Sequence, residues 1–209
     1  SYSQTPVTPD SGQYLPVEVT VDTVQEVIST LHRSDSYTRE IQIQDIWGQD
    51  SSGLTTINVW VDDNFTRTQA QLPSNRVQNT LIDGDTLYLW YDQSQRYLTL
   101  SADEASSDLV QRFPTYEDIL ALVPEQIVNA RYTDFSEELS RCIYVEVQEA
   151  TLDYLYRYWV DIDSGLLVAA ETEADGLVVY RMSSSSLQSP CPATASFQLP
   201  DGTVLHQAD

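Results

Sequence analysis

The chain has 209 residues, 41% of them hydrophobic, and 32 acidic against ten basic residues give it a formal net charge of −22. All ten basic residues are arginine, and a chain this anionic is repelled by nucleic-acid phosphates and by anionic lipid headgroups. These features argue against nucleic acid as a partner and against docking on a membrane through basic residues. No apolar run approaches the roughly 20 residues that span a bilayer, so we expect no direct membrane insertion of this segment. The acidity favours a soluble monomer.

The residue types present exclude most catalytic chemistries. Without lysine there is no Walker lysine, no Schiff base and no Ser-Lys dyad. Only His32 and His206 are present, too few for a histidine metal site, and we interpret both as structural. No nucleophile signature occurs. We therefore predict no catalysis, no cofactor and no metal. A carboxylate-based hydrolase is the minor alternative, since two converging carboxylates suffice for glycoside hydrolysis.

The first residues differ in composition from the rest of the chain. Residues 1–14 are rich in Ser, Thr and Pro, which is typical of a flexible tether. We predict that such a tether connects an exported domain to a lipid anchor or a membrane helix. No linker of similar composition follows, so residues 15–209 are predicted to form a single domain. The expected location is extracytoplasmic, either secreted or anchored to the cell surface.

Two cysteines, Cys142 and Cys191, match no metal or redox spacing. They form either one disulfide or two separate buried thiols. Cys191 lies between two prolines in a tail with few other apolar anchors, and a disulfide there would contribute roughly 3–4 kcal/mol by restricting the unfolded chain. We predict the disulfide, which would in turn support export.

Apolar residues at helical spacing predict two helices. Val24, Val27, Ile28 and Leu31 form one stripe in a helix over 21–33, where Thr23 and Glu26 resemble a capping box, although Thr20 or Asp22 is an equal candidate for the cap. A second helix is predicted over 115–123, after Pro114, with Thr115 as its cap. The stretch 103–113 is a candidate for a further short helix.

A period of two in the apolar residues predicts strands over most of the remaining chain. The predicted strands are 40–46, 55–62, 65–72, 76–82, 86–91, 96–101, 127–135, 140–147, 154–161, 166–171 and 177–183. Most gaps between them are short enough for hairpins, so the sheet should be a largely antiparallel meander.

Several strands carry apolar or aromatic residues on both faces. In the strand 154–161, for example, Tyr156 and Tyr158 alternate with Leu155 and Trp159. A sheet with one face in water would show cleaner alternation, so something covers the second face, and the two helices are the candidates. We predict an α+β fold that is mainly antiparallel β, a strongly curved, unclosed β-barrel wrapped around a few helices.

One motif recurs at strand ends. Trp60-Val-Asp62, Trp90-Tyr-Asp92 and Trp159-Val-Asp161 each place Trp-x-Asp before a turn. The last of these opens the hairpin 158–171, which is followed by a further strand at 177–181. This hairpin and the order of elements resemble the LolA/LolB/RseB-like superfamily. The resemblance implies an unclosed β-barrel with helices as a lid over an apolar cavity, in proteins that carry lipids or lipoproteins or sense envelope stress.

Two functional hypotheses follow from this resemblance. The first is a non-catalytic extracytoplasmic binding or carrier domain of the bacterial cell envelope, with a lipid or lipoprotein acyl chain as its apolar ligand. The second is an exported sensor or protein-interaction domain of a membrane-anchored regulator of the anti-sigma type, which has a protein partner. The candidate ligand contacts are inward-facing aromatic side chains, with core packing as their alternative role: Trp60, Trp90, Tyr156, Tyr158 and Trp159.

Overall fold

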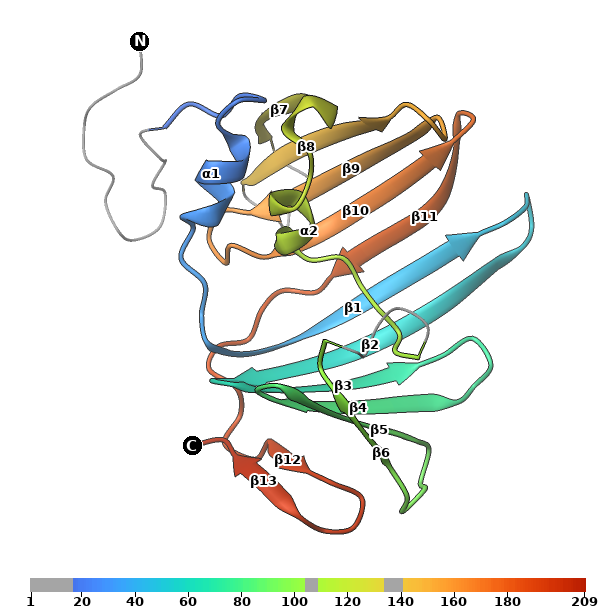
Figure 1. The fold of residues 1–209 in the computed structure, drawn as a ribbon, viewed down its shortest axis with the longest axis vertical. Helices are drawn as coiled ribbons and strands as arrows, with labels where there is room; N and C mark the ends of the chain where they lie inside the picture. The colour runs from blue at the N-terminus through green and yellow to red at the C-terminus, as the bar shows by residue number, and fades with distance from the viewer. Residues whose placement is uncertain (1–16, 104–108, 134–140) are drawn as a thin grey trace.

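The computed structural model describes residues 17–103, 109–133 and 141–209, so the tether expected at 1–14 lies outside the described residues. One antiparallel sheet of eleven strands dominates the described chain (Figure 1). Its strands are β1 (Ser36–Ile46), β2 (Ser52–Asp62), β3 (Phe65–Gln71), β4 (Val77–Asp83), β5 (Thr86–Tyr91), β6 (Leu98–Ser101), β7 (Ile127–Thr133), β8 (Cys142–Glu149), β9 (Tyr154–Asp161), β10 (Leu167–Ala174) and β11 (Leu177–Ser184). Parts of two predicted strands, residues 134–135 and 140, fall outside the described ranges.

The strand order is β6-β5-β4-β3-β2-β1-β11-β10-β9-β8-β7. Two meanders, β1–β6 and β7–β11, therefore meet at one seam between β1 and β11. The seam aligns Ile41 with Ser184 and Asp45 with Tyr180. Most of each meander consists of neighbouring strands joined by tight turns, which is why local alternation was sufficient to locate these strands.

The sheet is open, because its edge strands β6 and β7 do not pair with each other. The prediction of a mainly antiparallel, unclosed sheet is confirmed. The predicted strong curling is not found. The two α-helices have only six and five residues and lie over the β7–β11 half of the sheet in Figure 1, so they offer little for eleven strands to wrap around.

The helix α1 (Val24–Ser29) is shorter than the predicted 21–33 and has no capping box. The Thr23 hydroxyl instead accepts from the Thr20 amide and donates to the Glu18 carbonyl. The capping box occurs at α2 (Tyr116–Leu120), where Thr115 and Asp118 cap each other's backbone amides. A 3-10 turn, η1 (Pro124–Gln126), follows. The helix expected at 103–113 is not found at 109–113, and 104–108 lie outside the described part.

The main core lies between the two α-helices and one face of the sheet, which we call the inner face. Val24 and Ile28 of α1 and Ile119 of α2 are fully buried. The Gln25 amide ties the helices together by donating to the carbonyls of Ile119 and Leu122 at 3.0 Å each. The sheet contributes apolar residues from eight of its strands, including Ile41, Ile57, Ala70, Ile127, Val145, Val160, Leu167 and Met182.

A second core lies on the opposite, outer face. The C-terminal hairpin of β12 (Ser196–Gln198) and β13 (Val204–Gln207), which was not predicted, packs there with the fully buried Phe197 and with Leu199. It covers side chains of β2–β5, including Leu81 and Trp90. Different elements thus cover the two faces, which corrects the expectation that the helices would cover the second one.

The predicted disulfide between Cys142 and Cys191 is wrong. Both side chains are buried, but they lie apart. Cys142 begins β8, whereas Cys191 lies near the start of β1, where its amide donates to the Ser36 hydroxyl at 3.0 Å. Strands β9, β10 and β11 separate β8 from β1. Neighbouring strands are about 4.8 Å apart, so this separation exceeds the roughly 6 Å between the Cα atoms of a disulfide.

Candidate functional site

The inner face carries a pocket of about 450 Å³ beside the N-terminus of α2. Four of its ten lining residues are aromatic, and we call it the aromatic pocket. The side chains that define it are Phe113, Pro114, Tyr156, Tyr158, Thr172 and Tyr180, with Arg112 and Asp118 exposed at its mouth. A concave, mostly apolar site of this volume is in the range of pockets that hold small molecules.

Strand register brings the tyrosines together. Tyr156 and Tyr158 are two residues apart on β9, so both point to the inner face. On β10, Thr172 pairs with Tyr156 and also with Tyr180 of β11, which places the third ring on the same face. Ala170 lies opposite Tyr158 and leaves space because its side chain is small.

The other wall of the pocket is held in place by polar contacts. The side chain of Gln78, on the inner face of β4, accepts from the Gln111 amide at 2.7 Å and donates to the Leu109 carbonyl at 2.9 Å. These bonds fix the segment that leads to Phe113. The capping box at Thr115 then starts α2, whose Asp118 carboxylate accepts from the Thr115 amide at 2.8 Å.

The phenols of the pocket stay neutral. Burial, with smaller effects from Asp118 and Tyr156, raises the pKa of Tyr158 to about 12. Burial also raises the pKa of Tyr180 and of Tyr156 above the ordinary range. At neutral pH the pocket therefore offers aromatic faces and uncharged hydroxyl groups, which suit a ligand that is apolar with a few polar atoms.

Metal clusters and general acids are the two catalytic features that can be sought among the described residues. They contain no group of three or more His, Cys, Asp or Glu placed to hold a metal ion. The carboxyl groups among them with a shifted pKa are Asp62, Asp92 and Asp201, and each is shifted downward by hydrogen bonds. A general acid needs a raised pKa, so these groups do not fit the hydrolase alternative.

No helix in this part of the chain has the length and apolar character to cross a bilayer.

The structure divides the five aromatic residues singled out from the sequence. Tyr156 and Tyr158 lie together in the aromatic pocket. Trp159 faces the outer side, with its ring 5.2 Å from that of Tyr144. Trp60 and Trp90 lie beneath the C-terminal hairpin. Sequence reasoning missed Tyr180 and Phe113. Tyr180 and the apolar Met182 are two residues apart in one strand and so share a face, which was the available signal for Tyr180.

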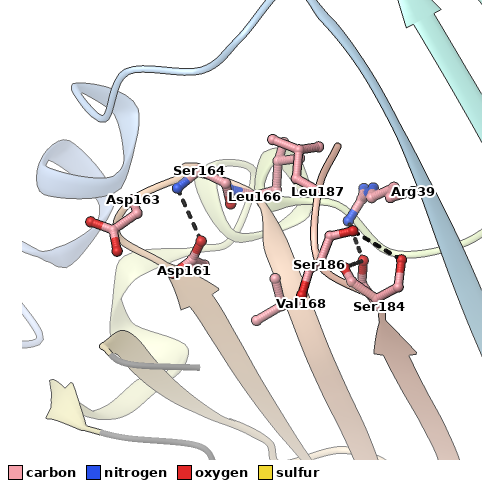
Figure 2. A pocket seen from close by; sticks show the side chains of 10 residues that line it. Arg39, Asp161, Asp163, Ser164, Leu166, Val168, Ser184, Ser186 and Leu187 are labelled. Carbon is pink, nitrogen blue, oxygen red and sulfur yellow. Dashed lines mark hydrogen bonds between the residues drawn. The ribbon is translucent and has the colours of Figure 1, made fainter. Parts of the chain in front are cut away.

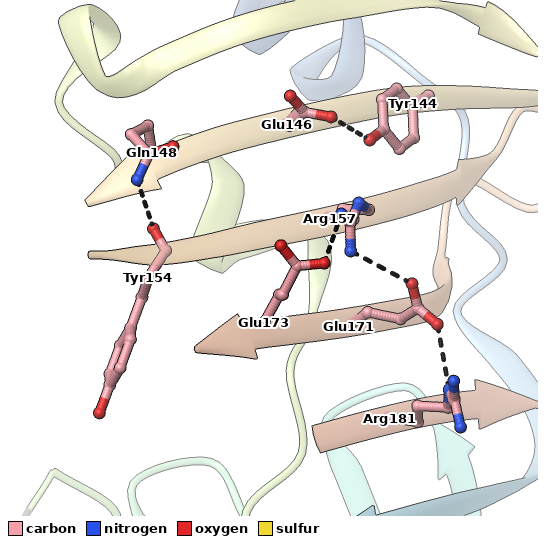
Figure 3. Close-up of polar contacts among 8 residues, drawn as sticks. All are labelled: Tyr144, Glu146, Gln148, Tyr154, Arg157, Glu171, Glu173 and Arg181. Atoms are coloured by element: carbon pink, nitrogen blue, oxygen red, sulfur yellow. Dashed lines mark hydrogen bonds and ion pairs between the residues drawn. The ribbon is translucent and has the colours of Figure 1, made fainter. Parts of the chain in front are cut away.

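A charged and aromatic ladder covers the outer face of β8–β11 (Figure 3). Arg157 pairs with Glu173 at 3.0 Å and with Glu171 at 3.6 Å, and Arg181 pairs with Glu171 from the other side at 3.1 Å. Tyr144 donates to Glu146 on the same face. Neither α-helix nor the C-terminal hairpin packs on this ladder. Arg181 is exposed, Arg157, Glu171 and Glu173 are partly exposed, and Tyr144 is buried.

No family model and no curated protein matches the sequence. Among solved structures, a LolA superfamily protein from Nitrosomonas europaea is similar at 15% identity, with a TM-score of 0.38, over 81% of this chain and 93% of that chain. MucB, solved in complex with MucA(peri), is similar at 16% identity, with a TM-score of 0.45, over 83% and 56%. A putative outer membrane lipoprotein-sorting protein domain from Vibrio parahaemolyticus matches at 12% identity, with a TM-score of 0.33, over 81% and 91%. The resemblance to the LolA/RseB-like proteins is thus found among solved structures as well, as a similarity of fold at low identity.

Proposed function

We propose that this domain binds an apolar or amphipathic small molecule, such as a lipid or an acyl chain, in the aromatic pocket without changing it chemically. The observation that carries the proposal is the convergence of Phe113, Tyr156, Tyr158 and Tyr180 around about 450 Å³ of space. These rings come from three separate parts of the chain, and the charged residues that line the pocket with them are Arg112, Asp118 and Glu171. A ligand would bury its apolar part against the rings and direct polar atoms to the phenols.

The test is binding of a fluorescent acyl probe to the purified domain. We expect saturable binding by the wild type and at least tenfold weaker binding by Thr172→Trp, because an indole on the inner face of β10 would fill the pocket. Leu177→Trp is the matched control, since Leu177 is 71% exposed at the start of β11 and does not line the pocket. The absence of wild-type binding at micromolar concentrations, or equal binding by Thr172→Trp, would refute the proposal.

The proposed place of action is outside the cytoplasm, in the cell envelope of a bacterium, secreted or anchored to the surface. The strong acidity and the Ser/Thr/Pro-rich composition of residues 1–14 support it. The cysteines give it no support, because they form no disulfide with each other. The full-length gene tests this part, and an open reading frame that encodes neither an export signal nor an anchor would contradict it.

A second candidate is an exported sensor or protein-interaction domain. The ladder on the outer face favours it, because arginine is enriched at protein interfaces and here Arg181 is exposed and Arg157 partly exposed on one face of the sheet. This function predicts a transmembrane helix upstream and a cytoplasmic domain in the same gene. It also predicts that Arg181→Glu abolishes binding to the partner while acyl-probe binding persists.

A further inference from the structure

Next to the seam between the two meanders, the sheet has a gap. The regular pairing of β1 with β11 stops at Ile41 and Ser184, so beyond that point no strand of the described residues lies between β1 and β10. The Ser185 amide still donates to the Glu40 carbonyl of β1 at 2.8 Å. Ser186 and Leu187 then bulge opposite Arg39 before Gln188 forms an isolated bridge with Thr38. On the other side, β10 has an irregular register between Leu167 and Ala169. Irregularities of this kind are frequent beside functional sites.

Arg39 bridges this gap. Its side chain lies on the inner face of β1, is 6% exposed, and donates through Nη1 to the Leu167 carbonyl of β10 at 2.8 Å and to the Ser184 hydroxyl at 3.4 Å. Its buried Nε has no hydrogen-bond partner among the described residues. No described carboxylate forms an ion pair with it, and burial lowers the pKa of its guanidinium, opposed only by Tyr37. A buried cation without an anion is costly, so the position calls for a negatively charged group.

The gap contains a pocket of about 300 Å³ beside Arg39 (Figure 2). Residues Ser184–Ser186 form one wall, in which the Ser184 and Ser185 hydroxyls donate to the next residue's carbonyl. Leu166, Val168 and Leu187 supply apolar surface. Asp161 and Asp163 lie on the turn at the end of the pocket away from the guanidinium in Figure 2. Arg39 also lies over the Phe113 ring, with its Cζ 5.8 Å from the ring centroid, so it separates this pocket from the aromatic one.

These features select a chemical class of ligand. One guanidinium can neutralise one negative charge, and two carboxylates at the far end repel a second. The planar fork of arginine matches a carboxylate, and the space left over has room for a short apolar chain. We propose that Arg39 and the loop Ser184–Ser186 bind the carboxylate group of a small organic acid, whose apolar part packs against Val168 and Leu187.

Titration of the whole chain with butyrate, followed by isothermal calorimetry or amide chemical shifts, tests this site. We expect saturable binding by the wild type, and binding at least tenfold weaker for butyramide, which has the same shape without the charge. Inorganic phosphate should bind more weakly than butyrate. Equal binding of butyramide, tighter binding of phosphate, or no saturable binding of butyrate would each overturn the proposal.

Substitutions that line the pocket beside Arg39 should show whether butyrate binds there. Arg39→Gln should weaken butyrate binding at least tenfold, and Leu187→Trp, which fills the pocket from a partly exposed loop position, should do the same with Arg39 intact. Arg67→Gln is the matched control, because Arg67 is a second arginine whose buried Nε lacks a partner among the described residues but which lies against Trp60 under the hairpin. Unchanged binding by Leu187→Trp would refute the site even if Arg39→Gln failed to fold. Thr172→Trp should leave butyrate binding intact, which separates this proposal from that for the aromatic pocket.

Discussion

The imidazole Nε2 of His206 lies 2.6 Å from Oδ2 of Asp62, and the same ring stacks on Phe65 at 4.4 Å between centroids. His206 is on β13, whereas Asp62 and Phe65 flank the turn between β2 and β3. The contact therefore pins the C-terminal hairpin to the outer face of the sheet. A histidine that looks incidental in the sequence is thus the polar anchor of the second core.

The Asp62 contact predicts a specific dependence of stability on pH. Hydrogen bonds from Ser36, and then from His206, lower the pKa of Asp62 below its unfolded value of about 3.9. The stabilisation from Asp62 is therefore complete above about pH 5 and is lost as pH falls through the folded-state pKa. In urea unfolding, the difference in stability between the wild type and Asp62→Asn should be largest near neutral pH and should shrink below about pH 4. Asp22→Asn, at an exposed position, is the control. A difference independent of pH would contradict the expectation.

Phe197 should carry much of the stability of the hairpin. Its side chain is fully buried against Leu81 and Trp90. Phe197→Ala removes that packing and leaves a cavity, so we expect a loss of about 3–5 kcal/mol in the free energy of unfolding, measured by denaturant titration. Val204→Ala, at a position 53% exposed in the same hairpin, should change it by no more than about 0.5 kcal/mol. Similar losses in both variants would show that the hairpin does not pack as described.

Alanine substitutions at two glycines with positive φ should distinguish the cost of backbone strain from the cost of a steric clash. Gly165 (φ +73°) and Gly176 (φ +79°) both adopt the left-handed conformation, so Ala should cost roughly 1–2 kcal/mol at either position. A Cβ at Gly176 would meet nothing, whereas at Gly165 it would lie 2.9 Å from the His32 carbonyl oxygen and 2.7 Å from Cγ of Arg33. Gly165→Ala should therefore be clearly the more destabilising in thermal unfolding. Equal melting temperatures would rule out close packing of this turn against His32 and Arg33, which follow α1.

The capping box of α2 should matter for both stability and the aromatic pocket. Thr115→Ala removes the hydroxyl that accepts from the Glu117 amide, and we expect a loss of about 1 kcal/mol. Because α2 positions one edge of the pocket, acyl-probe binding should weaken as well. Thr115→Ser retains the hydroxyl and should behave as the wild type in both measurements. If Thr115→Ala also matched the wild type, the cap would have no role in forming the site.

Local patterns predicted the strands well where the period of two was continuous. The bounds of β5 and β9 coincide with the predicted 86–91 and 154–161. The C-terminal hairpin was missed because β12 and β13 have only three and four residues, too few for a period to emerge among the surrounding Ser, Pro and Gly. The pairing of β1 with β11 could not be predicted either, because the residues of a strand do not indicate which distant strand will pair with it.

The candidate site could be predicted only in part, for a related reason. Alternation shows that Tyr158 and Trp159 face opposite sides of the sheet, but when both faces are apolar it does not show which side the helices cover. The structure places the helices on the side of Tyr158, and all three Trp-x-Asp tryptophans on the other. The sequence did not single out Arg39. Whether an arginine has an anionic partner depends on the folded structure and not on its neighbours in the sequence.

The seam between β1 and β11 also has a consequence for the order of assembly. Its partners lie about 140 residues apart in the chain, so closing it costs far more loop entropy than any hairpin, and the two meanders should form first. Until β11 arrives, β1 is hydrogen-bonded to β2 on one side and presents unpaired amides and carbonyls on the other. That transient edge is a template for strand pairing between molecules, so aggregation during refolding should begin there.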